Sequence, residues 1–185
     1  MDDAGIIELY LARSQDAIVE TDRKYGRLCR HIAMNILHND EDSEECVNDT
    51  YFGVWNAIPP QMPSKLSAFI SKIARNLALK KYDYITAAKR NPEASSSLSE
   101  LEECVSGRQS VEDIAENKRI EKAIGDFLWL QSVEKRTVFI RRYWYFDSID
   151  DIAEHCGFTR SKVASMLHNT RRKLREYMEK EDIDI

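Results

Sequence analysis

The chain has 185 residues, of which 43% are hydrophobic and 32% are charged, and its formal net charge is −5 at pH 7. This length suits one large domain or two small ones, and no apolar run is long enough to span a membrane. The first residues lack the basic start and long apolar segment of a signal peptide, so we expect a cytoplasmic protein. The four cysteines include no Cys-x-x-Cys pair, which favours reduced packing thiols over a metal site.

Helical periodicity runs through the first half of the chain, and strand-like alternation is absent. Ser14 is expected to cap a long helix, because its hydroxyl can accept a bond from a free backbone N–H. A second helix is expected from Asp42 to Ile58, where a Pro-Pro pair ends it, and Ser64 is expected to cap a third. The predicted inward-facing residues of these helices are Ile18, Tyr25, Leu28, Ile32, Ile36, Cys46, Val47, Thr50, Tyr51, Val54, Trp55, Ile58, Leu66, Phe69, Ile70, Ile73 and Leu77.

The periodic pattern stops after Arg90. Residues 91–113 are rich in Ser and Glu and poor in large apolar residues, which predicts a flexible acidic linker. The sequence therefore predicts an all-α protein with two small helical domains, 1–90 and 114–181, on either side of this linker. The apolar residues that resume the helical spacing are Ile120, Ala123, Ile124, Phe127, Leu130, Val133, Thr137, Ile140 and Tyr143.

Residues 148–175 have the pattern of a helix-turn-helix whose second helix is basic. Ser148 is the expected cap of the first helix, Gly157 supplies a left-handed turn residue, and Thr159 caps the second helix. In such a pair, the first helix supports the second, and the second can enter the major groove of DNA. Two ordinary packed surface helices are the alternative, and the basic charge favours DNA. The apolar positions expected on the second helix are Val163, Leu167, Leu174 and Tyr177.

Charge is unevenly distributed along the chain. Residues 40–49 contain six acids and no base, whereas residues 65–90 contain seven Lys or Arg and one acid. In the basic segment Lys72, Asn76 and Lys80 recur every four residues, with Arg75 beside them. Cations can follow phosphates and an amide can read the edge of an unpaired base, so this stripe suits single-stranded DNA. An ordinary solvated helix face is the alternative.

Three motifs follow one another in the chain: DSEECVNDTYFGVWNAI, SAFISKIARNLALKKY and SIDDIAEHCGFTRSKVASMLHNTRRKLREYME. In their order and spacing they resemble the extracytoplasmic-function (group 4) sigma factors of the sigma-70 family, over roughly residues 10–180. The resemblance implies an alternative sigma factor that binds core RNA polymerase, recognises the −10 and −35 promoter elements and starts transcription. It implies no enzymatic activity, cofactor, metal or small-molecule substrate, and it implies an anti-sigma factor as a further partner.

The resemblance also assigns residues to three surfaces, and it implies that the chain contacts the flap of the second-largest polymerase subunit. Docking on the clamp of the largest subunit is expected from Asp42, Glu45, Asn48 and Asp49, together with Glu44 in the same acidic cluster. Binding of the −10 element is expected from Lys72, Arg75, Asn76 and Lys80, beside the loop 57–67. Base-edge and phosphate contacts with the −35 element are expected from Arg160, Ser161, Lys162, Ser165 and Asn169, and phosphate contacts from Arg171, Arg172 and Lys173.

Ala164 and Met166 stand where many members of the family carry cations, which implies weaker −35 binding or a different −35 sequence.

Two other functions stay open at this point. One is a two-domain helix-turn-helix regulator that binds DNA without core polymerase. The other is a carboxylate-based hydrolase that uses Glu44, Glu45 and Asp49, although no histidine is placed to serve these acids and no phosphate-binding glycine loop is present.

Overall fold

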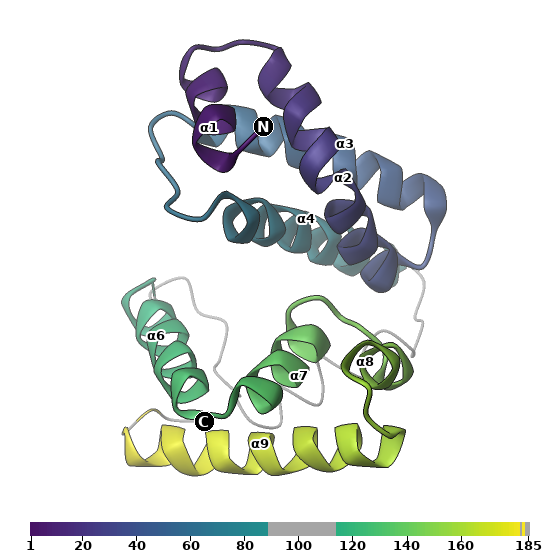
Figure 1. The fold of residues 1–185 in the computed structure, drawn as a ribbon, viewed down its shortest axis with the longest axis vertical. Coiled ribbons are helices and arrows are strands. Elements are labelled where there is room, and N and C mark those ends of the chain that lie inside the picture. The colour runs from purple at the N-terminus through teal and green to yellow at the C-terminus, as the bar shows by residue number, and fades with distance from the viewer. Residues whose placement is uncertain (89–113, 182, 184–185) are drawn as a thin grey trace. The chain divides into compact units, whose positions relative to one another are not determined.

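The computed structural model describes residues 1–88, 114–181 and 183, and every regular element within these ranges is an α-helix (Figure 1). The prediction of an all-α fold is confirmed. The chain divides into two compact units, Met1–Asn91 and Pro92–Ile185. The predicted linker, 91–113, lies outside the described residues.

The described part of the first unit consists of α1 (Asp3–Leu11), α2 (Asp16–Leu37), α3 (Asp40–Ala57) and α4 (Leu66–Ala88). α2 packs against each of the other three helices, and α3 also packs against α4 (Figure 1). This arrangement places a small apolar core among the four helices, so the outer faces of α3 and α4 carry the polar residues. The core is formed by Ile6, Tyr10, Ala17, Tyr25, Cys29, Val54, Ile58, Leu66, Ile70 and Ala74.

Two buried cysteines of the first unit, Cys29 and Cys46, were expected to be packing thiols. Cys29 is fully buried and Cys46 is 2% exposed, and burial raises the pKa of the two thiols to about 12 and about 11. Both are free, as is the half-buried Cys156. At these pKa values Cys29 and Cys46 stay protonated near neutral pH and pack as small apolar side chains.

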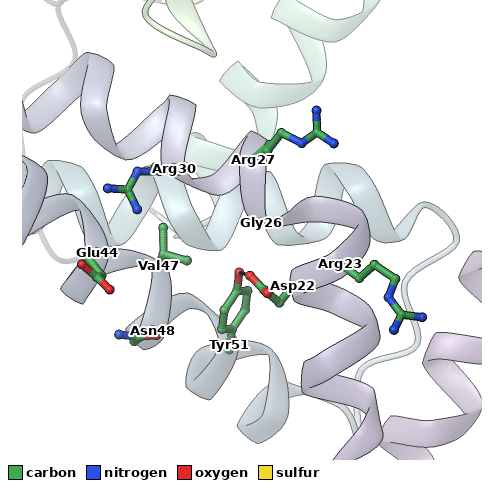
Figure 2. A pocket seen from close by; sticks show the side chains of 9 residues that line it. All are labelled: Asp22, Arg23, Gly26, Arg27, Arg30, Glu44, Val47, Asn48 and Tyr51. Atoms are coloured by element: carbon green, nitrogen blue, oxygen red, sulfur yellow. Dashed lines mark hydrogen bonds between the residues drawn. The ribbon is translucent and has the colours of Figure 1, made fainter.

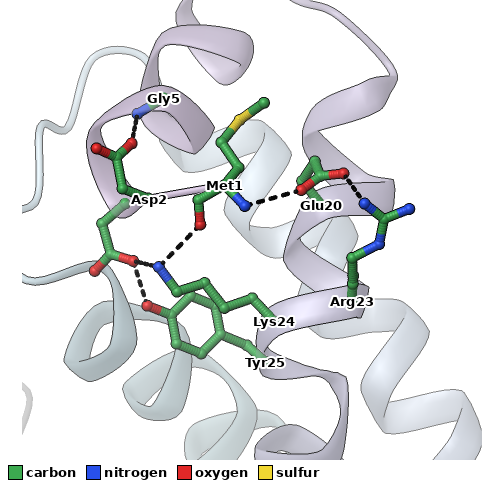
Figure 3. A network of polar contacts seen from close by, with 8 residues as sticks. Met1, Asp2, Gly5, Glu20, Arg23, Lys24 and Tyr25 are labelled. Atoms are coloured by element: carbon green, nitrogen blue, oxygen red, sulfur yellow. Dashed lines mark hydrogen bonds and ion pairs between the residues drawn. The ribbon is translucent and has the colours of Figure 1, made fainter.

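α1 has no counterpart among the helices that the sequence predicted. Asp2 caps it by accepting a hydrogen bond from the Gly5 backbone N–H at 2.9 Å, and α1 buries Ile6 and Tyr10 completely. Asp3, the first residue of α1, forms an ion pair with Lys24 of α2, with Lys24 Nζ 2.6 Å from Asp3 Oδ1 (Figure 3). A helix of nine residues is marginal by itself, so these tertiary contacts account for its formation.

The starts of the other three helices differ from the predicted ones by one or two residues. α2 begins after Gln15 without a side-chain cap, although the Ser14 hydroxyl does accept a hydrogen bond from the Asp16 N–H at 3.3 Å. α3 is capped by Asn39 and begins two residues before the predicted Asp42. α4 begins at Leu66, one residue later than a cap at Ser64 predicts. Several adjacent residues here have side chains that can cap a helix, and tertiary packing selects among them.

The described part of the second unit consists of α6 (Ile114–Leu130), α7 (Val133–Tyr143), α8 (Ile149–Cys156) and α9 (Arg160–Lys180). α6, α7 and α8 all pack on the same side of α9, so the opposite face of α9 is left to solvent (Figure 1). Leu130 and Val133, predicted on apolar stripes, are instead 73% and 67% exposed, because they flank the turn between α6 and α7. The core is formed mainly by Phe127, Val138, Phe139, Tyr143, Ile152, Val163, Leu167, Leu174 and Met178.

The turn between α8 and α9 contains each of the local features expected from the sequence. Ser148 and Asp151 form a capping box, in which each side chain accepts a hydrogen bond from the other residue's backbone N–H. Gly157 has a φ of +65°, a conformation that a residue with a Cβ adopts at a cost. Thr159 Oγ1 accepts a hydrogen bond from the Lys162 N–H at 3.2 Å. These caps fix where α9 begins and therefore which of its residues face outward.

Candidate functional site

The acidic residues expected to contact a protein partner lie on one face of α3. Glu45, Asn48 and Asp49 are exposed, whereas Asp42 is half-buried. The first turn of α3, which follows the Asn39 cap, contains the acids Asp40, Glu41 and Asp42, where the helix dipole favours negative charge. This face therefore combines carboxylates with one amide, which is a surface suited to a basic partner.

Two of these acids already have a partner within the chain. Lys81 Nζ, from α4, lies 2.7 Å from Asp42 Oδ1 and 2.5 Å from Glu45 Oε2. Burial alone would lower the pKa of Lys81, but the hydrogen bonds and charges of Asp42 and Glu45 outweigh it and raise that pKa. Lys81 was not among the predicted site residues, because nothing local in the sequence connects positions so far apart.

The predicted polar stripe is present on α4. Lys72, Asn76 and Lys80 are exposed at every fourth position. The opposite side of the helix carries the buried residues Leu66, Ile70, Ala74 and Ala78, so packing orients the stripe outward.

Arg75 differs from the rest of the predicted −10 residues. Its side chain is half-buried, and burial lowers the pKa of its guanidinium. Arg75 therefore lies between the core and the stripe and does not share the exposure of Lys72, Asn76 and Lys80.

Large apolar and aromatic side chains are exposed near both ends of α4. Met62, on the loop that precedes the helix, is 71% exposed, and Tyr84, in its last turns, is 79% exposed. Phe69, which the sequence placed facing inward, is half-buried. Exposed aromatic rings, such as that of Tyr84, are surfaces on which unpaired bases stack.

On α9, most of the predicted DNA-contacting residues are on the outer face. The helix buries Val163, Leu167, Thr170, Leu174 and Met178 against the rest of the unit. The predicted residues that are exposed on the opposite side are Arg160, Ser161, Lys162, Ser165, Asn169, Arg172 and Lys173.

Several cations of α9 are engaged within the chain. Arg160 Nη1 lies 2.8 Å and 2.6 Å from the two carboxylate oxygens of Asp150, on α8. Arg172 pairs with Glu176 at 3.0 Å, one turn further along α9. Nucleic-acid phosphates would have to compete with these carboxylates for the two arginines.

Arg171 stands apart from the other predicted phosphate contacts. It is half-buried, and its Nη1 donates a hydrogen bond to the Tyr143 hydroxyl, on α7, at 2.6 Å. This bond fastens the middle of α9 to the core of the unit. Arg171 therefore has a structural role in addition to any contact with a ligand.

A groove of about 350 Å³ lies between α2 and α3, next to the acidic face (Figure 2). Tyr51 donates a hydrogen bond to Asp22 Oδ1 at 2.6 Å across it. Gly26 leaves room for this bond, since a Cβ there would lie 2.5 Å from Asp22 Oδ1 and 3.1 Å from the Tyr51 hydroxyl. Arginines of α2 form one wall, opposite an acid and an amide of α3. The charged or amide residues that line the groove are Asp22, Arg23, Arg27, Arg30, Glu44 and Asn48.

The basic wall of this groove was not predicted. The three arginines stand at positions 23, 27 and 30, which share one face of a helix, so their spacing in the sequence could have revealed them. Their position opposite Glu44 and Asn48 depends on the packing of α2 against α3.

Residues 22–90 match a family model described as Sigma-70 region 2. The matched segment begins within α2 and includes α3, the loop and α4, so it contains the acidic face, the groove and the polar stripe. The match supports a member of the sigma-70 family. It indicates a sigma factor-like role in binding RNA polymerase, and this family domain is a transcription-factor domain rather than a catalytic one.

No curated protein matches the chain. The matched family domain implies binding to core RNA polymerase and to promoter DNA. Among the helices that the structure describes, none is both long and apolar enough to cross a bilayer.

Proposed function

We propose that the protein is an alternative sigma factor of the extracytoplasmic-function group, which acts in the cytoplasm, binds core polymerase, recognises the −10 and −35 elements and starts transcription. The observation that carries the proposal is that one helical unit, matched by the family domain, presents an acidic face on α3 and an exposed Lys–Asn–Lys stripe on α4. A subunit that joins an enzyme to a promoter needs two such surfaces on one rigid body.

The polymerase surface in this proposal is the acidic face of α3 together with the groove beside it. Asp42, Glu45, Asn48 and Asp49 would meet a basic surface on the clamp of the largest subunit. The arginines that line the opposite wall of the groove would meet acids on the same partner. Opposite charges arranged in this way give specificity and orientation to an interface more than raw affinity.

The −10 surface is the stripe on α4. Separating a base from the duplex costs a few kcal/mol, and the opened state persists only if the protein returns that energy through hydrogen bonds and stacking. Asn76 lies one turn from Lys72 and one turn from Lys80, so its amide can meet an unpaired base while the lysines hold the adjacent phosphates. Tyr84 offers an exposed ring on which a base can stack.

The −35 surface is the outer face of α9, which would read bases through Ser165 and Asn169 and hold phosphates through its cations. The exposed apolar pair Leu130 and Val133 lies elsewhere in the same unit and is available for the flap of the second-largest subunit. Two units on one chain raise promoter affinity through effective concentration, so each contact can be weak. An anti-sigma factor would act by covering one of these surfaces.

The test is promoter opening in the presence and absence of core polymerase from the same organism. Permanganate reactivity of thymines in the −10 element reports unpaired bases, and co-purification with the tagged chain reports polymerase binding. We expect opening only when both proteins are present. Tight binding to duplex DNA without polymerase, and no opening with it, would instead identify a two-domain DNA-binding regulator.

A further inference from the structure

Lys81 connects the two surfaces of the first unit. It follows Lys80 of the exposed stripe on α4, yet its Nζ lies 2.7 Å from Asp42 Oδ1 and 2.5 Å from Glu45 Oε2, on α3. One cation of the helix proposed to bind DNA is therefore held by two acids of the face proposed to bind polymerase.

The three side chains of this cluster differ in exposure. The exposed fraction is 21% for the Lys81 side chain, 32% for that of Asp42 and 67% for that of Glu45, so a partner can approach Glu45 without any movement of the helices. Ion pairs between partly exposed groups contribute little free energy, and cations of a partner can therefore replace them.

We propose that Lys81 couples polymerase binding to capture of the melted −10 strand, an inference that rests on the proposed function. In the free chain, Asp42 and Glu45 hold Lys81 away from nucleic acid. Basic groups of the polymerase take over the two carboxylates on binding, and the released Lys81 adds a cation to the phosphate-binding stripe beside Lys80. Because coupling between two sites is reciprocal, the single strand then also strengthens polymerase binding.

The first experiment uses the free full-length chain and a fluorescent single-stranded oligodeoxynucleotide of mixed sequence, about ten nucleotides long. The double variant Asp42→Asn/Glu45→Gln keeps the size of both side chains and removes the charges that hold Lys81. We expect it to bind the strand about fivefold more tightly than the wild type. The extra contact should also steepen the dependence of log K on log salt concentration, by about 0.7.

The matched control is Glu41→Gln/Glu44→Gln, which changes the net charge of α3 by the same amount. Both residues are exposed, and neither is a partner of Lys81 in the part of the chain that the structure describes. We expect the control to gain clearly less affinity for the strand than the first double variant does. Adding Lys81→Met to the first double variant should reduce its affinity for the strand to the level of the control. An equal gain in the control, no gain in either variant, or a gain that survives Lys81→Met would each overturn the proposal.

The second experiment measures polymerase affinity with and without the same oligonucleotide. We expect the strand to tighten binding of the wild type about fivefold and to have little effect on the Lys81→Met variant. Equal tightening in both chains would overturn the coupling, even if polymerase binding and promoter opening are normal. A wild-type chain that fails to bind polymerase would instead contradict the proposed function, so the two failures can be told apart.

Discussion

The cations that lie on or beside the proposed DNA surfaces of the two units are held in different ways. In the first unit, the acids that hold Lys81 lie on the face proposed to bind polymerase. In the second unit, Arg160 and Arg172 are held by Asp150 and Glu176, neither of which is proposed to bind polymerase. Binding of a protein partner can thus release a cation in the first unit, whereas in the second unit only DNA itself competes for the arginines.

This difference has a consequence for how each unit meets DNA. The stripe on α4 would gain a cation when polymerase arrives, so its affinity depends on the partner. α9 would lose part of its affinity for phosphates to its own carboxylates under all conditions.

The largest effect is expected at the acidic face. Changing Glu45 and Asp49 to Lys places like charges against a basic partner surface, which can cost several kcal/mol, so we expect roughly a hundredfold loss of polymerase affinity. Both residues are exposed, so helicity measured by circular dichroism should be unchanged. The matched control is Glu154→Lys/Glu179→Lys, which makes the same charge change on the second unit. If both double variants bind polymerase equally well, the assignment of α3 is wrong.

The next effect concerns strand opening. Asn76→Ala removes the amide between Lys72 and Lys80, and we expect about a tenfold loss of open complex on a duplex promoter, equivalent to the loss of one or two hydrogen bonds. A promoter already mismatched at its −10 element should recover most of this loss, because unpairing no longer has to be driven. Permanganate footprinting measures both templates. Asn169→Ala, in the second unit, should change which −35 sequence is preferred, and a mismatched −10 element should not restore its open complex. Identical behaviour of the two variants would contradict the division of roles between the units.

A smaller effect separates the two neighbouring arginines of α9. Removing either Arg171 or Arg172 should weaken binding of the second unit to all DNA sequences and reduce the salt slope by about one. Only Arg171→Ala should also lower the free energy of unfolding, by about 1 kcal/mol, because it breaks the bond to the Tyr143 hydroxyl.

Tyr143→Phe provides the control for this pair. It should reproduce the loss of stability in thermal unfolding while leaving the salt slope of DNA binding unchanged. A stable Arg171→Ala variant would show that the bond to Tyr143 contributes nothing measurable to folding.

The smallest expected effect concerns the competition between Asp150 and DNA phosphates for Arg160. Asp150→Asn removes the carboxylate that holds Arg160, so binding to duplex DNA should become about two- to threefold tighter, in keeping with the modest free energy of an exposed ion pair. Glu154→Gln, an exposed acid of the same helix, changes the net charge equally and should have a weaker effect. Fluorescence anisotropy at several salt concentrations distinguishes the two variants.

Features set by neighbouring residues could be predicted from the sequence alone. The helix ends around Ser148, Gly157 and Thr159 depend on contacts within four positions, and each is found where it was predicted. The outward stripe of Lys72, Asn76 and Lys80 follows from helical periodicity in the same way. Such features require no knowledge of how one helix packs on another.

Contacts between distant residues were decided only by the tertiary structure. Lys81 meets Glu45 across 36 positions and Arg171 meets Tyr143 across 28, and neither pair has a local signal. The half-burial of Arg75 and the formation of α1 also depend on the packing of one helix against another. Periodicity tells which face of a helix is apolar, but long side chains at the border of that face find their partners only once the helices are packed together. The sequence by itself therefore determined the helices other than α1 and most of the exposed charges, and the packing of the helices decided which of those charges hold one another.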